Sequence, residues 1–134
     1  QIEIFIKKIK ENTSAKIAIT TLPWLGEQEH ASIIDVVKRH NNIIKEIAIK
    51  YDLTILDLFS KFSKQINSNH SVPYTTSELR RLRGLRAVIL HYVFGWSWTK
   101  IGAKYNLKLL CDHIHLNERG GYLMENLVKE FLSS

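Results

Sequence analysis

Apolar residues recur every three to four positions over most of the chain, which is the spacing of amphipathic helices. Residues that favour helix N-caps precede three of these segments, namely Asp57, Ser97 and Asn117. Gly95 follows another segment and is predicted to end it. The pattern predicts helices over about residues 1–11, 30–50, 58–66, 77–94, 98–105 and 118–132.

Two short segments depart from this spacing. Lys16–Leu22 and Leu53–Leu56 are mostly apolar or β-branched and do not alternate with polar residues. Strands that are buried on both faces of a parallel sheet show this pattern. The predicted helix over residues 30–50 connects the two segments, so we expect a βαβ unit with a right-handed crossover. The chain therefore belongs to the α/β class by pattern.

The composition is that of a globular domain. The 134 residues fit one domain, and 45% hydrophobic and 24% charged residues exclude disordered and low-complexity classes. Charged residues interrupt every long apolar run, so we expect no membrane span. Cys111 is the only cysteine, which excludes an internal disulfide and favours a reducing compartment such as the cytoplasm.

The net charge of +6 is concentrated in one stretch of the chain. Residues 1–77 carry +2, residues 78–108 carry +6 and residues 109–134 carry −2. The basic stretch over 78–108 is either a patch for phosphate or another anion, or a solvated helix face beside an acidic neighbour. Its cationic residues are Arg80, Arg81, Arg83, Arg86, Lys100, Lys104 and Lys108.

A polar cluster with candidate chemistry lies just before the last predicted helix. It reads Cys-Asp-His-Ile-His-Leu-Asn over residues 111–117, so Asp112 comes three residues before His115. In a serine hydrolase a histidine accepts the proton of the nucleophile, and a carboxylate orients that histidine. Asp112 and His115 are therefore the candidate catalytic pair. For His113 we expect a solvent-facing position in the loop.

Three stretches of the sequence resemble one enzyme family. The stretch Asp112–Gly120 resembles the last signature block of the SGNH, or GDSL-type, esterases and acylhydrolases, in which Asp-x-x-His-Leu-Asn and a Gly open the C-terminal helix. Ile17–Gly26 resembles the fourth strand of that family with its pocket loop, and Leu53–Leu58 resembles the fifth strand. The resemblance covers roughly residues 15–60 and 107–132.

The resemblance implies a fold. It implies a three-layer α/β/α sheet of the flavodoxin-like type, of which residues 1–134 form the later half within a single domain. The helical residues at about 67–106 would be an insertion before the catalytic loop. This insertion either walls an acyl site over that loop or simply packs onto it. Gly120 would let the last helix pack closely.

The resemblance also implies an activity. It implies ester hydrolysis by a Ser-His-Asp mechanism on a small ester, with His115 as base and Asp112 as its orienting acid, and with neither a metal nor an organic cofactor. Trp24 is a candidate for the substrate pocket because it follows the carboxyl end of a predicted strand, where open α/β sheets bind ligands.

Half of this site is missing from the sequence. The chain has no Gly-Asp-Ser block for the nucleophile and no counterpart of the blocks that supply the oxyanion-hole Gly and Asn. Ser97 follows a predicted helix rather than a strand, so it is a helix cap and not a nucleophile elbow. We expect the nucleophile within about 70–100 residues upstream of Gln1.

The predicted sheet also leads us to expect that a part of the domain is missing from this sequence. The strand over residues 16–22 is apolar enough to be central, and its missing neighbour would leave an unpaired edge that recruits other strands. We expect an upstream segment, a separate chain or a second copy of this chain to complete the sheet.

Two further interpretations remain open. A metal site would use Asp112, His113 and His115, with His70 or His91 as a further ligand. A nucleic-acid-binding module would use the basic stretch over 78–108, because Gly95–Leu107 resembles the first half of a helix-turn-helix. Its second helix would start near Lys108 and would need an apolar residue where Asp112 stands.

Overall fold

The structure is a computed structural model that describes residues 2–29, 31–66, 70–74 and 77–134, with the backbone alone over 77–81. All predicted helices and both predicted strands are present, and their ends lie within two residues of the predicted positions. The elements are α1 (Ile2–Asn12), β1 (Ala18–Thr20), α2 (Ser32–Lys50), β2 (Thr54–Leu56), α3 (Leu58–Gln65), α4 (Ser77–Tyr92), α5 (Trp98–Ala103) and α6 (Glu118–Leu132).

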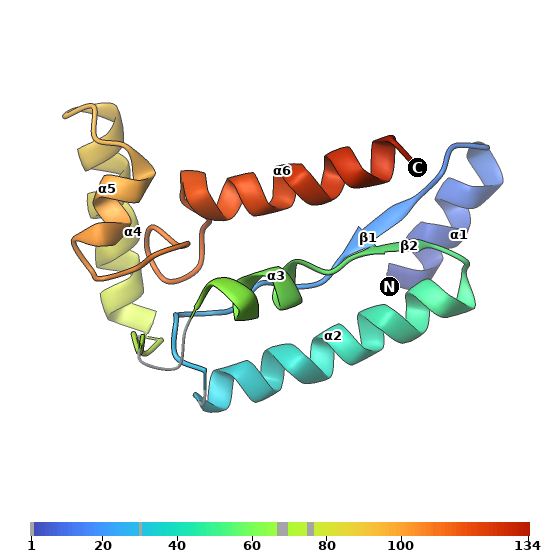
Figure 1. Ribbon diagram of the computed structural model, residues 1–134, viewed down its shortest axis with the longest axis horizontal. Coiled ribbons are helices and arrows are strands. Elements are labelled where there is room, and N and C mark those ends of the chain that lie inside the picture. Colours follow the sequence, from blue (N-terminus) through green and yellow to red (C-terminus); the bar gives the residue numbers. More distant parts are fainter. Residues whose placement is uncertain (1, 30, 67–69, 75–76) are drawn as a thin grey trace.

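The two strands form a parallel sheet, as the βαβ pattern predicted. Ala18 lies opposite Thr54, and Thr20 lies opposite Leu56. Figure 1 shows α2 on one side of this sheet and α6 on the other. The carboxyl ends of β1 and β2 point toward the side of the molecule where α4, α5 and the start of α6 lie. The described residues are therefore mixed α/β and mostly helical, with one short sheet.

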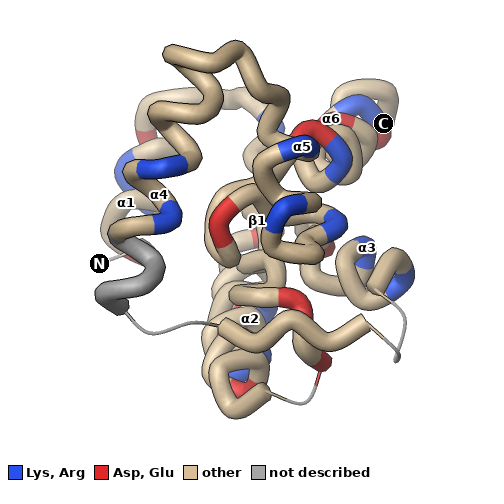
Figure 2. Tube along the Cα trace, turned by 90° about the vertical axis from the view of Figure 1, so that its left-hand side faces the viewer, with Lys and Arg blue, Asp and Glu red and all other residues tan. Residues whose placement is uncertain are grey.

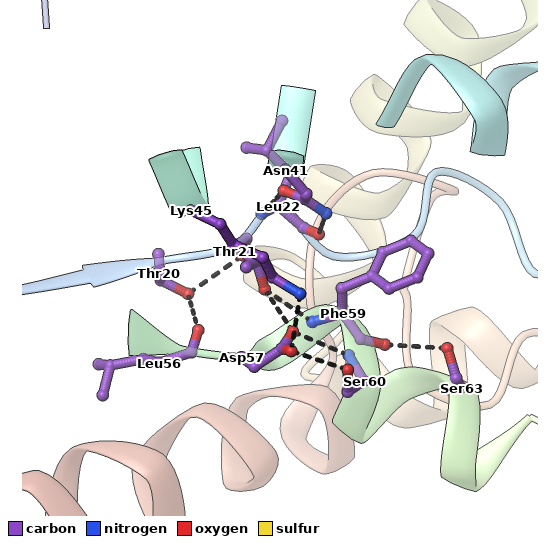
Figure 3. Close-up of polar contacts among 10 residues, drawn as sticks. All are labelled: Thr20, Thr21, Leu22, Asn41, Lys45, Leu56, Asp57, Phe59, Ser60 and Ser63. Atoms are coloured by element: carbon purple, nitrogen blue, oxygen red, sulfur yellow. Dashed lines mark hydrogen bonds and ion pairs between the residues drawn. The ribbon is translucent and has the colours of Figure 1, made fainter. Parts of the chain in front are cut away.

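A polar cluster fixes the carboxyl ends of both strands (Figure 3). The Thr21 hydroxyl donates to Asp57 Oδ1 at 3.1 Å, and it accepts a hydrogen bond from the Phe59 backbone N–H at 3.0 Å. Asp57 caps α3 through the Ser60 backbone N–H and pairs with Lys45 Nζ at 3.2 Å. Burial raises the pKa of the Asp57 carboxyl, but the hydrogen bonds from Ser60, Lys45 and Thr21 outweigh it and hold that pKa below its usual value.

Asn41 determines where the chain goes after β1. This buried side chain of α2 accepts a hydrogen bond from the Leu22 backbone N–H at 2.7 Å and donates to the Leu22 carbonyl at 3.0 Å (Figure 3). Because this buried amide bonds to both the N–H and the carbonyl of Leu22, it restricts the backbone conformation directly after β1. The chain is thereby led to Trp24, which is buried.

The hydrophobic core joins segments that are far apart in the sequence. It includes Ile34 of α2, Phe62 of α3 and Leu127 of α6. The loop residues Trp24 and Leu110 belong to the same cluster. The core therefore continues from the sheet to the loops at the carboxyl ends of the strands, so these loops are packed rather than loose.

The helix-turn-helix interpretation requires a second helix near Lys108, and that expectation is wrong. After α5 the chain forms a loop over residues 107–117, which is closed by an isolated antiparallel bridge between Leu110 and Leu116. The backbone hydrogen bonds here run across the loop and not along a helix, because the Asn117 N–H donates to the Leu109 carbonyl and the Cys111 N–H donates to the His115 carbonyl, each at 2.9 Å. No recognition helix follows α5.

The described basic side chains of this stretch lie against different aromatic rings, and Figure 2 shows where Lys and Arg occur along α4 and α5. The Arg83 guanidinium lies 4.7 Å from the centroid of the Tyr105 ring. Lys100 and Lys104 instead lie over the Trp96 ring, at 4.1 and 5.6 Å from its centroid. The side chains of Arg80 and Arg81 lie outside the described residues. Among the described helices, none has both the length and the apolar character that crossing a membrane requires.

Gly120 allows the close packing of α6 that we expected. A Cβ atom at this position would collide with the carbonyl oxygen of Leu109, whereas a Cβ atom on the neighbouring Gly121 would meet no heavy atom within 4 Å. The two glycines are consecutive residues of one helix and differ in what faces them.

This difference gives a paired prediction. Gly120→Ala should lower the free energy of unfolding by about 1–3 kcal/mol, because the methyl group forces the loop away from α6. Gly121→Ala should raise it by up to about 1 kcal/mol, because alanine favours the helix. Chemical denaturation of the two variants measures both effects, and equal effects of the same sign would contradict the close contact.

Candidate active site

The candidate residues lie in the loop over residues 107–117, which is held closely in place. The Asn117 side chain donates to the carbonyl oxygens of Lys108 and Leu110 at 3.0 and 3.2 Å. Its Oδ1 accepts hydrogen bonds from the backbone N–H groups of Arg119 and Gly120, so Asn117 also caps α6 as predicted. One side chain therefore attaches the loop to the start of the helix.

Asp112 and His115 are in direct contact, as their spacing predicted. Asp112 Oδ2 lies 2.8 Å from His115 Nδ1. Asp112 Oδ1 accepts hydrogen bonds from the backbone N–H of His115 at 2.9 Å and from that of Ile114 at 3.2 Å. Burial raises the pKa of the Asp112 carboxyl, but the hydrogen bonds from His115 and Ile114 outweigh it and hold the pKa below its usual value. Asp112 is therefore an ionised carboxylate at neutral pH.

The protonation of Asp112 determines how the imidazole is oriented. An ionised carboxylate can only accept a hydrogen bond, so His115 Nδ1 is the donor. This leaves Nε2 of the neutral ring as the nitrogen that can accept a proton. The side chain of Asp112 is 8% exposed and that of His115 is 74% exposed. The pair thus combines a buried carboxylate with an accessible imidazole, an arrangement that suits general base catalysis.

Cys111 carries the only thiol of the sequence and directly precedes Asp112, and its burial makes it unreactive. Burial raises the pKa of the Cys111 thiol to about 12, and the neighbouring Asp112 carboxylate adds to the effect. Only the thiolate is a strong nucleophile, and this thiol stays protonated at neutral pH. His115 is therefore not part of a cysteine–histidine pair with Cys111.

The expectation that His113 faces solvent is wrong. His113 is 1% exposed, and its backbone has a positive φ of 78°. Arg83 Nη1 contacts His113 Nε2, and because a guanidinium can only donate, this ring nitrogen accepts. The Gly26 backbone N–H donates to the His113 carbonyl at 2.8 Å. His113 therefore points inward, whereas the side chain of His115 is mostly exposed.

His113 is a neutral imidazole in this environment. Burial lowers its pKa first, and the positive charge of Arg83 lowers it further. Its Nδ1 is buried and has no hydrogen-bond partner among the described residues. A non-glycine residue with positive φ and an unpartnered polar atom is strained, and such strain concentrates at functional loops.

Glu27 is the residue at this site that the sequence did not reveal. Its carboxylate is fully buried and accepts four hydrogen bonds. Three come from the backbone N–H groups of Lys108, Leu109 and Leu110, and the fourth comes from His70 Nε2 at 2.7 Å. Glu27 therefore fixes the segment over residues 108–110, which leads into Asp112.

No sequence signal distinguishes Glu27 from its neighbour Glu29. Both are acidic residues in the same predicted loop, yet Glu29 is exposed. The difference arises because Gly26 has a positive φ of 70° and leaves no room for a Cβ atom against the Tyr74 backbone. The chain turns inward at Gly26, and Glu27 is the residue that follows.

Trp24 occupies a different place from the one expected. Its indole is 2% exposed, belongs to the hydrophobic core and lies 5.9 Å from the Phe59 ring between centroids. A ring that is covered in this way cannot touch a substrate. The structure therefore places Trp24 in the hydrophobic core and not in an open pocket.

The possible metal ligands are dispersed. In the described part of the chain, no three side chains of His, Cys, Asp or Glu come together in a way that would hold a metal ion. His70 is bound to Glu27, and His91 Nδ1 donates to the Trp96 carbonyl at 2.7 Å. The histidines that a metal site would add to Asp112 and His115 are thus engaged elsewhere.

Comparison of the chain with protein-family models and with curated proteins, and of its structure with solved structures, gave no match.

The buried carboxylate of Glu27 yields a sharp stability prediction. Glu27→Gln should lower the free energy of unfolding by about 3 kcal/mol, because the amide turns a donor toward N–H groups that have no other partner. Glu29→Gln makes the same chemical change at an exposed position and should have an effect within about 0.5 kcal/mol. Denaturant titration of both variants provides the test, and equal stabilities would show that the Glu27 network contributes nothing.

The neutral state of His113 predicts a dependence of stability on pH. Folding lowers the pKa of His113. Below about pH 6.5 the unfolded chain therefore binds more protons at this residue than the folded protein does. The free energy of unfolding should then fall on acidification from pH 7.5 to pH 5, by at most about 1.4 kcal/mol per pH unit from this group.

His113→Asn should remove this contribution, since asparagine does not titrate and tolerates positive φ. The comparison is the slope of unfolding free energy against pH for the variant and the parent. His40→Asn, on the exposed face of α2, serves as the control and should leave the slope unchanged. An identical slope in His113→Asn would show that His113 is not the titrating group.

Proposed function

We propose that this chain is the later half of an SGNH-type ester hydrolase domain and supplies the acid–base part of a Ser-His-Asp site. The observation that carries the proposal is the 2.8 Å hydrogen bond between Asp112 Oδ2 and His115 Nδ1, in the loop that opens α6. The same loop contains the Asp-x-x-His-Leu-Asn pattern and the close-packed Gly120. The exposure of His115 beside a buried carboxylate also supports it.

In this proposal the described sheet is part of a larger three-layer α/β/α sheet of the flavodoxin-like type. The sandwich of α2, the strands and α6 supports that arrangement (Figure 1). Within the described residues each strand has one partner, so an edge of each is open to a further strand. A segment upstream, a separate chain or a second copy would add the missing strands, and the nucleophilic serine would come with the first or second of these.

The chemistry assigns a role to each nitrogen of His115. Nε2 takes the proton of the serine hydroxyl as the oxygen attacks the carbonyl carbon of the ester. It then gives that proton to the oxygen of the leaving alcohol as the tetrahedral intermediate collapses to an acyl-enzyme. Nε2 next takes a proton from the attacking water and returns it to the serine. Asp112 stabilises the imidazolium through Nδ1 in both halves of the reaction.

Ser97 does not supply the nucleophile in this mechanism. Its hydroxyl oxygen accepts a hydrogen bond from the Lys100 backbone N–H at 3.1 Å, so Ser97 caps α5 as predicted. A hydroxyl that serves as a cap is held in place by the helix and not by His115. The proposal places the nucleophilic serine outside residues 1–134, because the sequence has no Gly-Asp-Ser block.

A fluorophosphonate probe tests the proposal in the natural gene product that contains these residues. The probe should label one serine outside residues 1–134, and His115→Ala should abolish both labelling and turnover of p-nitrophenyl acetate, a loss of about 10⁴-fold or more. His40→Ala removes an exposed histidine of α2 and should leave turnover unchanged.

Two results would contradict the proposal. One is labelling of a serine within residues 1–134. The other is a folded gene product, with a thermal midpoint like that of His40→Ala, whose turnover does not change in His115→Ala.

A further inference from the structure

The helix α4, at one end of the molecule in Figure 1, turns its small residues inward and its large apolar residues outward. Ala87 is buried, and a Cβ atom on Gly84 would lie 3.7 Å from Asp112 Oδ2. On the opposite side, apolar residues recur at spacings of three and four and are 43–75% exposed. These residues, which we call the outer face, are Leu82, Leu85, Ile89, Tyr92 and Val93. Surface helices normally show the reverse pattern, so the outer face requires a partner.

The turn after α4 extends this apolar surface. Phe94 is 65% exposed and directly follows the outer face. The Gly95 N–H donates to the His91 carbonyl and the Trp96 N–H donates to the Leu90 carbonyl, both at 3.0 Å. Gly95 has the positive φ of 66° that such a helix end needs. Phe94 is therefore presented to solvent by a backbone that is hydrogen-bonded on both sides of it.

Positive charge borders the outer face. Arg86 is exposed, and its spacing on α4 puts it at the border of that face. Beyond the turn, Lys100 and Lys104 lie over the Trp96 ring, at 4.1 and 5.6 Å from its centroid. Glu78 is the only acidic residue of the basic stretch to which all these residues belong. Apolar surface and positive charge therefore occur together here.

We infer that the outer face docks the protein on a membrane surface that carries anionic lipids. The helix α4 lies in the plane of the headgroups, with the outer face against the acyl chains and the cations against the headgroup anions. The long side chain of Arg86 can reach the headgroups from the border of the helix. Trp96 is suited to the headgroup level, where tryptophan is enriched. This docking goes beyond the proposed function and does not depend on it.

The charge favours an anionic lipid surface over other partners. Two copies that met through their outer faces would bring two stretches of +6 together, and like charges repel. A nucleic acid would match the cations but would leave Leu85 and its apolar neighbours in contact with water. An anionic bilayer supplies negative charge and an apolar interior at the same surface.

Cosedimentation with lipid vesicles tests the inference in the natural gene product that contains these residues. The vesicles consist of phosphatidylcholine alone or of phosphatidylcholine with about 30% phosphatidylserine. The protein should bind the anionic vesicles about tenfold or more tightly than the neutral ones, because several cations face the headgroups. Raising the salt concentration to about 0.5 M should weaken this binding through screening.

Leu85→Glu tests the apolar part of the surface. The variant removes a leucine from the membrane contact and adds a negative charge, so it should weaken binding to the anionic vesicles about tenfold or more. Leu132→Glu makes the same change at a residue that is 76% exposed at the end of α6. This control should bind the vesicles as the parent does.

Arg86→Gln tests the electrostatic part of the surface. It should weaken binding to the anionic vesicles about fivefold, as expected for one cation near such a surface, and should not change binding to the neutral ones. Arg39→Gln removes an exposed cation of α2 and should have no effect on either.

Three results would overturn the inference, and each identifies a different situation. If Leu85→Glu binds the anionic vesicles as the parent does, the outer face does not contact lipid. If the parent ignores vesicles and size-exclusion chromatography shows a dimer that Leu85→Glu dissociates, a second copy covers the face. If the parent ignores vesicles and Leu85→Glu melts about 4 °C or more below Leu132→Glu, another part of the same polypeptide covers it.

The vesicle experiment is independent of the hydrolase test. Turnover that His115→Ala abolishes, in a gene product that binds no vesicles, leaves the proposed function standing and overturns the docking. Vesicle binding that Leu85→Glu weakens, in a gene product without a labelled serine, supports the docking and counts against the hydrolase.

Discussion

The buried carboxylate of Glu27 is the interaction on which the geometry of the candidate site depends. Four donors meet at this one group, and three of them are backbone N–H groups of consecutive residues, 108–110. A fully buried charge is stable only when its oxygens are satisfied in this way. Because Asp112 follows this segment by two residues, the position of the candidate acid is fixed by a residue from the loop after β1. The site is thus attached to the sheet through a charge and not through packing alone.

The βαβ unit provides the frame for this attachment. Asn41 on α2 binds both backbone groups of Leu22, and Asp57 joins the end of β1 to the start of α3. These contacts direct the loop after β1 toward the core, where Gly26 bonds to the carbonyl of His113. The carboxyl ends of parallel strands are the usual ligand-binding edge of an α/β sheet. The loop between α5 and α6, which contains the candidate pair, lies on this side of the molecule (Figure 1).

The two histidines of the loop show how one tight turn creates two environments. The inward ring of His113 is kept neutral by burial and by Arg83, and the outward ring of His115 meets a carboxylate and solvent. The positive φ of His113 reverses the chain between them, since alternate side chains would otherwise share a side. The arrangement supplies a base, but neither the Cys111 thiol, which stays protonated, nor the Ser97 hydroxyl, which caps α5, serves it as a nucleophile.

The sequence by itself determined the features that act over a few residues. Helix and strand positions follow from local periodicity, and the caps Asp57, Ser97 and Asn117 act within three residues of their own positions. The contact of Asp112 with His115 belongs to the same group, since a spacing of three residues in a tight loop brings the two side chains together. These predictions succeeded because their partners are neighbours in the chain.

Only the tertiary structure decided the features that join distant segments. Glu27 bonds to residues 81 to 83 positions away, and nothing in the sequence separates it from Glu29. Trp24 was expected in a pocket and is in the core, and His113 was expected in solvent and is buried, because burial depends on what the rest of the chain places over a residue. The second helix that a helix-turn-helix would need after α5 is absent, and the backbone there bonds across the loop, from the Asn117 N–H to the Leu109 carbonyl and from the Cys111 N–H to the His115 carbonyl. Local pattern specifies the elements, whereas long-range hydrogen bonds and packing decide which polar groups meet.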